Sequence, residues 1–195
     1  MHKGVILLVK ATDEEEASDK VNEFMEGYQG QVWDWWSLGG RWTGTLDKYN
    51  PSEDPKNLET CFLCNGTGLR NDELGKQARK ENPEYTCNGC GGTGKSVKFP
   101  SDWKHKNNIM PLSNCLGVVK EWAQDPEKEF EEHSKKALEN YKDNRSMKAY
   151  SLKVAAQLLG EEFCFDCNVY NLEDYDYSIP EDVEGFFAVM VDMHN

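Results

Sequence analysis

The sequence predicts an α+β protein in which helices cover one face of a mainly antiparallel sheet and a cysteine-rich segment is inserted. Two uninterrupted apolar runs of strand length lie toward opposite ends of the 195-residue chain, at 4–9 and 185–191. Between them, apolar residues recur at helical spacing, and paired cysteines interrupt this pattern at 61–98. We therefore expect residues 1–60 and 99–195 to form one body around an insertion at 61–98.

The first half of the body carries a signal for each element. The run at 4–9 is rich in β-branched residues and predicts a strand in the middle of the sheet. Thr12 and Glu15 have the spacing of a capping box, which predicts a helix over 13–26 that Gly27 ends. Residues 31–46 resemble a hairpin that turns at 37–40. Residues 100–111 form a polar connector without periodicity.

The second half is mainly helical and then returns to strands. Acidic residues at 125–132 favour a helix start, Asp143 and Asn144 interrupt the pattern, and Gly160 is a candidate C-cap. Strands are expected at 163–170 and 185–191. The resulting order β-α-β-β-(insertion)-α-β-β is at most ferredoxin-like, and it makes the two apolar runs neighbouring central strands.

The charge distribution limits the classes of partner. The chain has 22 basic and 35 acidic residues, hence a net charge of −13, which disfavours a general binder of nucleic acid or anionic membranes. Residues 61–106 carry +3 and the remainder −16. No apolar run approaches the roughly 20 residues that span a bilayer, and no signal peptide precedes the first strand. These features predict a cytoplasmic protein.

Six of the seven cysteines form Cys-x-x-Cys pairs, and two pairs share a longer motif. Residues 61–68 and 87–94 both read Cys-x-x-Cys-x-Gly-x-Gly. Four thiolates can surround a tetrahedral Zn²⁺, and glycines after each pair allow backbone N–H groups to turn toward the sulfurs. The pattern predicts one structural zinc ion bound by Cys61, Cys64, Cys87 and Cys90. Two disulfides or free dithiols are the alternatives.

This motif resembles the cysteine-rich zinc domain of the DnaJ (Hsp40) chaperones, in which the octapeptide occurs four times and builds two zinc sites. Two copies here imply one zinc ion. No histidine precedes Pro-Asp, so the J-domain signature is absent and a co-chaperone role is not implied.

A second candidate site lies at 34–42, where tryptophans, glycines and one arginine cluster. Arg41 beside aromatic faces could bind a carboxylate, a phosphate or a base, with Asp34 orienting its guanidinium. The simpler interpretation is that the tryptophans belong to the core and that Arg41 pairs with Asp34. The candidate partner-binding residues are Asp34, Trp35, Trp36, Gly39, Gly40, Arg41 and Trp42.

The pattern Asp-Trp-Trp-x-x-Gly-Gly-Arg-Trp-x-Gly at 34–44 resembles a motif in uncharacterised small proteins of phages and actinobacteria. In that group a zinc-knuckle insertion and a last strand near Val-Asp-x-His often follow. This chain has the cysteine segment and ends with Val191-Asp192-Met193-His194. The resemblance implies a phage or mobile-element origin, hence a location in the host cytoplasm, and it implies no reaction.

Three weaker signals remain. Cys164 and Cys167 lie in a predicted strand and favour thiols over a second metal site with Cys115 or a histidine. Asp192 and His194 share a strand face, as a surface pair or as an acid–base or metal pair. The acidic segment 173–184 is a solvated loop or an imitation of a nucleic-acid backbone.

Together these patterns favour a zinc-containing acidic binding protein, a phage-type accessory or inhibitor that docks on a host protein such as a defence enzyme or one acting on nucleic acid. A small anionic ligand or nucleotide bound at 34–42 is the first alternative, and nucleic-acid contact through the zinc segment is the second. The sequence has no common catalytic motif, so the balance is against an enzyme and we assign no catalytic residues.

Overall fold

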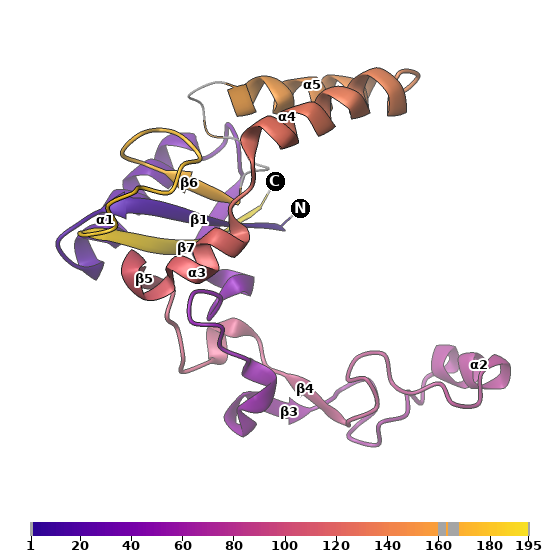
Figure 1. Ribbon diagram of the computed structural model, residues 1–195. Helices are drawn as coiled ribbons and strands as arrows, with labels where there is room; N and C mark the ends of the chain where they lie inside the picture. The colour runs from indigo at the N-terminus through magenta and orange to yellow at the C-terminus, as the bar shows by residue number, and fades with distance from the viewer. Residues whose placement is uncertain (1, 160–162, 164–167, 195) are drawn as a thin grey trace. The chain divides into compact units, whose positions relative to one another are not determined.

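A computed structural model describes residues 2–159, 163 and 168–194 (Figure 1). The chain divides into two compact units. Residues 1–49 and 106–195 form the unit called here the body, and residues 50–105 form the cysteine unit, which contains the segment 61–98.

The body is built on a sheet of strand order β2-β7-β1-β6, with β5 pairing β7 beside β2. Among the strand pairs of this sheet that the structure describes, only the pairing of β1 with β6 is parallel. This arrangement confirms an α+β fold with a mainly antiparallel sheet. The body's strands and helices are β1 (His2–Lys10), α1 (Glu14–Tyr28), β2 (Trp35–Leu38), β5 (Ile109–Pro111), α3 (Leu112–Trp122), α4 (Pro126–Lys135), α5 (Arg145–Leu159), β6 (Val169–Asn171) and β7 (Phe186–His194).

The pairing of β1 with β7 is the centre of the sheet and runs from His2 opposite His194 to Lys10 opposite Phe186. These are the two apolar runs, so their predicted neighbourhood is confirmed. Alternate residues of β1 enter two different cores: Leu7 packs with α1, and Leu8 packs with α3.

Helices therefore lie on both faces of β1 and β7 (Figure 1), whereas the sequence pattern predicted helices on one face only, in an arrangement at most ferredoxin-like. The physical reason is the apolar character of both faces. A strand without polar alternation exposes apolar surface unless a layer covers each side. The second layer is helix α3, which was not predicted as a separate element.

The segment predicted as a hairpin at 31–46 has a different structure. Only β2 is a strand, and it pairs with β7; residues Gly40–Trp42 form a 3₁₀ turn. Gly39 and Gly40 have positive φ angles of 69° and 51°, which glycine adopts without steric cost. After β2 the chain turns away from β7, so the second strand of the predicted hairpin does not form.

Two helix predictions are confirmed with shifted ends. Helix α1 begins one residue later than predicted, because Asp13 caps the N–H of Glu16 while the Glu16 carboxylate accepts from Thr12. Helices α4 and α5 run side by side (Figure 1) and are separated by a π-helical turn, Lys136–Asn140, and by the predicted interruption at Asp143. In the predicted strand 163–170, β6 begins only at Val169, and residues 164–167 lie outside the described part.

The cysteine unit contains a two-stranded antiparallel ribbon and one helix. Strand β3 (Leu58–Thr60) pairs with β4 (Lys95–Val97), and α2 (Glu73–Glu81) lies between the two cysteine pairs. Short 3₁₀ turns occupy Pro51–Glu53, Pro55–Asn57 and Pro100–Asp102.

The two-sided core predicts that neighbouring β1 residues are equally sensitive to truncation. Leu7→Ala and Leu8→Ala should each lower the free energy of unfolding by about 2–5 kcal/mol, because both side chains are fully buried. Chemical denaturation of the purified protein measures this, with Glu23→Ala on the exposed side of α1 as the control. A sheet covered on one face would instead make one of the two leucine substitutions nearly neutral.

Candidate metal centre

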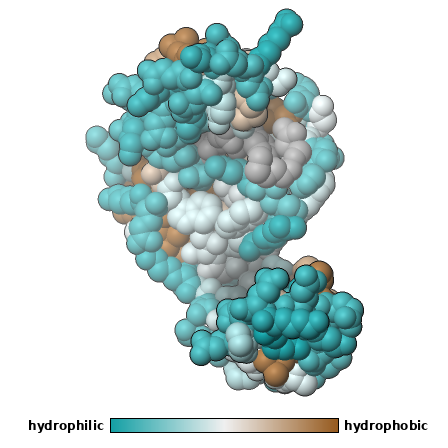
Figure 2. Space-filling view, turned by 90° about the vertical axis from the view of Figure 1, so that its right-hand side faces the viewer, coloured by the Kyte–Doolittle hydropathy of each residue, from teal (hydrophilic) through white to brown (hydrophobic). Residues whose placement is uncertain are grey.

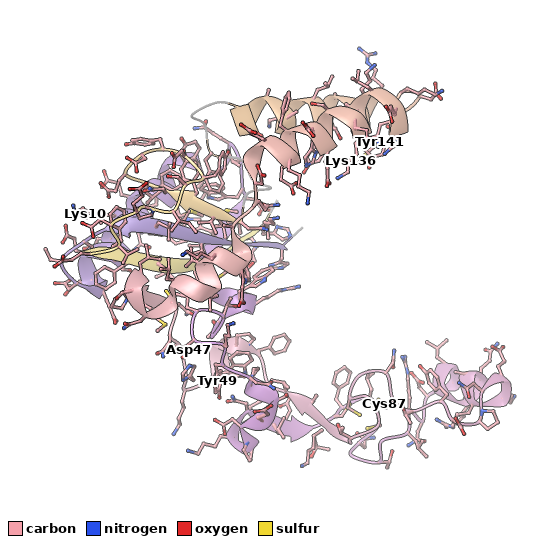
Figure 3. All side chains as sticks on the ribbon, viewed as in Figure 1. Lys10, Asp47, Tyr49, Cys87, Lys136 and Tyr141 are labelled. Atoms are coloured by element: carbon pink, nitrogen blue, oxygen red, sulfur yellow. The ribbon has the colours of Figure 1, made fainter. Side chains whose placement is uncertain are left out.

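The cysteine unit brings together the four cysteines of its two matching motifs, although 22 residues separate the pairs. The sulfur atoms of Cys61 and Cys87 are 3.9 Å apart, and those of Cys64 and Cys90 are 3.7 Å apart. All four sulfurs lie within 4.8 Å of one another (Figure 3). Among the residues that the structure describes, no other group of three or more His, Cys, Asp or Glu side chains is so arranged.

The four sulfurs fit one zinc ion. In a regular tetrahedron with each sulfur about 2.3 Å from the ion, sulfurs are about 3.8 Å apart. The Cys61–Cys87 and Cys64–Cys90 sulfur separations, 3.9 and 3.7 Å, match this value. Four cysteine ligands leave no open coordination position for substrate, so the zinc is structural.

The rest of the cysteine unit has no apolar core that could replace the ion. The cysteine cluster contains Cys61, Cys64 and Cys87 as buried members, with Leu63 and Cys90 packed against it. Of the large apolar side chains in this unit, Trp103 alone is buried among the described residues. Small units without sufficient core depend on disulfides or metals, so the zinc site is the main source of the unit's stability.

The two cysteine motifs are related by a local pseudo-symmetry. Cys61 N–H donates to Gly94 O at 3.0 Å, and Cys87 N–H donates to Gly68 O at 2.8 Å. In each motif a threonine hydroxyl donates to the carbonyl of the second cysteine at 2.7 Å. Each motif therefore positions the first cysteine of the other.

The last glycine of each motif is required by this close approach. Gly68 and Gly94 have φ angles of 75° and 74°. A Cβ atom on Gly94 would lie 2.3 Å from Gly66 O, and one on Gly68 would lie 2.3 Å from Gly92 O. The glycines of the repeated motif thus serve both the backbone conformation and the contact between the motifs.

The thiols differ in their electrostatic surroundings. Burial raises the pKa of the Cys87 thiol to about 11. Burial also acts to raise the pKa of Cys90, but hydrogen bonds from Gly94 N–H, Cys64 and Gly92 N–H outweigh it and lower the pKa to about 7. Gly94 N–H lies 3.3 Å from the Cys90 sulfur. This contact is the N–H···S interaction that the sequence predicted for the glycines.

The residues of the second candidate site do not converge on one surface. Trp36 packs in the core beside α1, whereas Trp42 packs in the core beside α3. Trp35 is partly exposed and stacks on His194, with ring centroids 5.7 Å apart and planes 9° apart. Trp36 and Trp42 therefore belong to the cores on opposite faces of the sheet, and Trp35 lies at the surface.

The predicted pairing of Arg41 with Asp34 is wrong. The Asp34 carboxylate accepts from His194 Nδ1 at 2.9 Å, and this hydrogen bond lowers the pKa of Asp34. The Arg41 side chain is exposed, and its backbone N–H donates to Asp192 Oδ2 at 3.0 Å. Gly40 permits this contact, because a Cβ atom there would lie 2.4 Å from the Asp192 side chain.

Sequence reasoning missed His2 as a member of this polar cluster. Asp192 is buried, and its second partner is His2 Nδ1 at 2.9 Å. The available signal was the position of His2 just before the first apolar run, in the strand that pairs with the last one. Cys115 is a buried free thiol on α3, and Cys164 and Cys167 lie outside the described residues.

Comparison with protein-family models, with curated proteins and with solved structures finds no match for this chain. Within the described residues, no helix is both long and apolar enough to cross a membrane.

The close approach of the two motifs predicts that Gly94→Ala weakens zinc affinity at least tenfold. A left-handed backbone costs a non-glycine residue about 1–2 kcal/mol, and the Cβ contact with Gly66 O adds to this. Competition with a chromophoric zinc chelator measures the affinity. The matched control is Gly91→Asn, since Asn65 holds the equivalent position with φ of 50° and no atom lies within 4 Å of a Cβ at residue 91. Equal zinc affinity of the two variants would contradict this role of Gly94.

Proposed function

We propose that the chain is a zinc-containing acidic binding protein whose cysteine unit docks on another protein. The zinc ion acts by folding this unit, which displays apolar side chains to the partner. The partner is a protein of the host cell, and the chain acts as an accessory or inhibitor of the phage type that its sequence pattern resembles.

The exposure of Phe62 carries this proposal. Phe62 and Leu63 separate the first two zinc ligands; Leu63 packs against the cysteine cluster, whereas Phe62 is 79% exposed. Asn88 holds the position of Phe62 in the second motif. Zinc coordination therefore does not require a phenylalanine at this position, and an exposed phenyl ring is the type of side chain that anchors protein interfaces.

Other apolar side chains of the same unit are exposed as well. Phe99 is 79% exposed and Leu74 on α2 is 66% exposed. Figure 2 shows hydrophobic patches on a mainly hydrophilic surface. Apolar anchors surrounded by polar residues are the composition expected of a transient protein interface.

The acidic character of the body supports a protein partner with a basic surface. Residues 50–105 contain eight basic and eight acidic side chains, so the whole net charge of −13 belongs to the body. The acidic segment 173–184 is ordered by its own contacts: Asp176 Oδ1 accepts from Ser178 N–H at 2.9 Å, and Asn171 donates to Asp174 at 2.9 Å. An ordered acidic loop favours association with a basic surface and raises the association rate.

The alternatives have less support. Four thiolates around Zn²⁺ add a charge of −2 to the cysteine unit, which reduces the attraction of nucleic acid to it. For a small ligand, a pocket of about 340 Å³ includes Trp42, Lys3 and Trp122, but Arg41, Trp35 and Trp36 are not among its lining residues.

The proposal predicts that Phe62→Asn abolishes partner capture while leaving zinc binding intact. Asparagine already occupies the equivalent position of the second motif, so the variant should hold one zinc ion per chain. Wild type and variant are immobilised in equal amounts and exposed to lysate of the cell that carries the gene, and captured proteins are quantified by mass spectrometry. We expect one protein enriched at least tenfold by the wild type over the variant.

Leu63→Asn is the contrasting variant, because Leu63 packs against the cysteine cluster. It should lower zinc affinity as well as capture, which distinguishes a structural defect from a lost anchor. Capture of the same proteins in the same amounts by wild type and Phe62→Asn would contradict docking through the cysteine unit.

A further inference from the structure

Two histidines meet at one end of the central strand pair, in the body and apart from the cysteines. His2 on β1 is directly opposite His194 on β7, and their ring centroids are 4.9 Å apart with planes at 69°. Trp35 contacts both rings, stacking on His194 and meeting His2 edge-on with centroids 5.2 Å apart. The histidine pair is part of neither the zinc centre nor the proposed docking surface.

Each imidazole is held through the same ring nitrogen. His2 Nδ1 lies 2.9 Å from Asp192 Oδ1, and His194 Nδ1 lies 2.9 Å from Asp34 Oδ1. An ionised carboxylate can only accept, so both Nδ1 atoms carry the proton and donate. In the neutral imidazole, this leaves the lone pair on Nε2.

This arrangement is the one found around metal-bound histidines, where a carboxylate fixes the ring through its other nitrogen. The distance between the rings also fits. If each Nε2 lies about 2.0–2.1 Å from a tetrahedral ion, the two ring centres are about 5 Å apart. The observed centroid distance is 4.9 Å.

A contribution to folding stability explains the His2–Asp192 pair but not the His194–Asp34 pair. Asp192 is 1% exposed, and a buried carboxylate needs partners such as His2 and the Arg41 N–H. The His194–Asp34 pair is different, because the Asp34 side chain is 64% exposed. Exposed ion pairs contribute little to stability, so an exposed carboxylate that fixes His194 beside His2 points to a ligand.

We propose that His2 and His194 together bind one divalent transition-metal ion through their Nε2 atoms, with Asp192 and Asp34 orienting the rings. Two imidazoles leave the remaining coordination positions to solvent, so this ion is exchangeable, unlike the zinc held by four cysteines. Nitrogen ligands of this kind suit Zn²⁺, Cu²⁺ and Ni²⁺. The bound ion would join the ends of β1 and β7 beside the exposed ring of Trp35.

The test uses untagged, zinc-loaded protein titrated with Ni²⁺, so that elemental analysis after equilibrium dialysis counts the added ion separately from zinc. Wild type should bind one Ni²⁺ per chain, and His2→Gln and His194→Gln should each weaken this binding at least tenfold. Asp34→Asn keeps both imidazoles and should weaken it about 10–100-fold, the usual effect of removing such a carboxylate. His105→Gln in the cysteine unit is the control and should not change the Ni²⁺ affinity.

Two further measurements distinguish a variant that has lost a metal ligand from one that has lost its folded structure. The zinc content and the circular dichroism spectrum of each variant should equal those of the wild type, and bound Ni²⁺ should broaden the NMR signal of the Trp35 indole N–H. The proposal is overturned if the wild type binds no Ni²⁺, or if His194→Gln binds Ni²⁺ as tightly as the wild type. Unchanged affinity in Asp34→Asn would overturn the orienting role of the carboxylate.

Discussion

The fold of the cysteine unit depends on one interaction, the coordination of a single ion by four thiolates. The sulfur positions fit a tetrahedral zinc, and the unit buries few apolar side chains besides. Because the ion substitutes for a core, apolar side chains such as Phe62 remain on the surface. The same constraint therefore explains the stability of the unit and the exposure of Phe62, and it leaves the metal without a catalytic position.

The body depends on a different constraint, the pairing of its first and last strands. Both strands are apolar on both faces, so α1 and α3 must cover opposite sides of the sheet. The pairing also brings His2 beside His194 and places Asp192 under the backbone of Arg41. Side chains nearly two hundred positions apart thus form one polar cluster. The loop at 173–184, before β7, adds an acidic surface to the body.

Local patterns predicted much of this structure. The two apolar runs, the interruption near Asp143 and the four zinc ligands followed from composition and spacing alone. The pairing of distant strands was harder to predict from the sequence. The tryptophan segment has the sequence pattern of a hairpin, but β2 pairs with β7 instead, so no second hairpin strand forms. The partner of Asp34 was likewise unpredictable, since His194 reaches it only through strand register. Helix α3 was missed because no side chain caps its N-terminus, where Pro111 precedes Leu112, although Leu112, Cys115 and Val119 recur at helical spacing.

The most direct test of the central claim is X-ray absorption spectroscopy at the zinc edge of purified protein, dialysed first to remove any exchangeable ion from the histidine pair. The claim predicts one zinc ion per chain with four sulfur neighbours at about 2.3 Å and no nitrogen or oxygen in the coordination sphere. Protein that lacks zinc and contains Cys61, Cys64, Cys87 and Cys90 as disulfides would contradict it. A zinc ion bound by nitrogen or oxygen would contradict it equally, because the cysteine unit would then lack the interaction on which its fold depends.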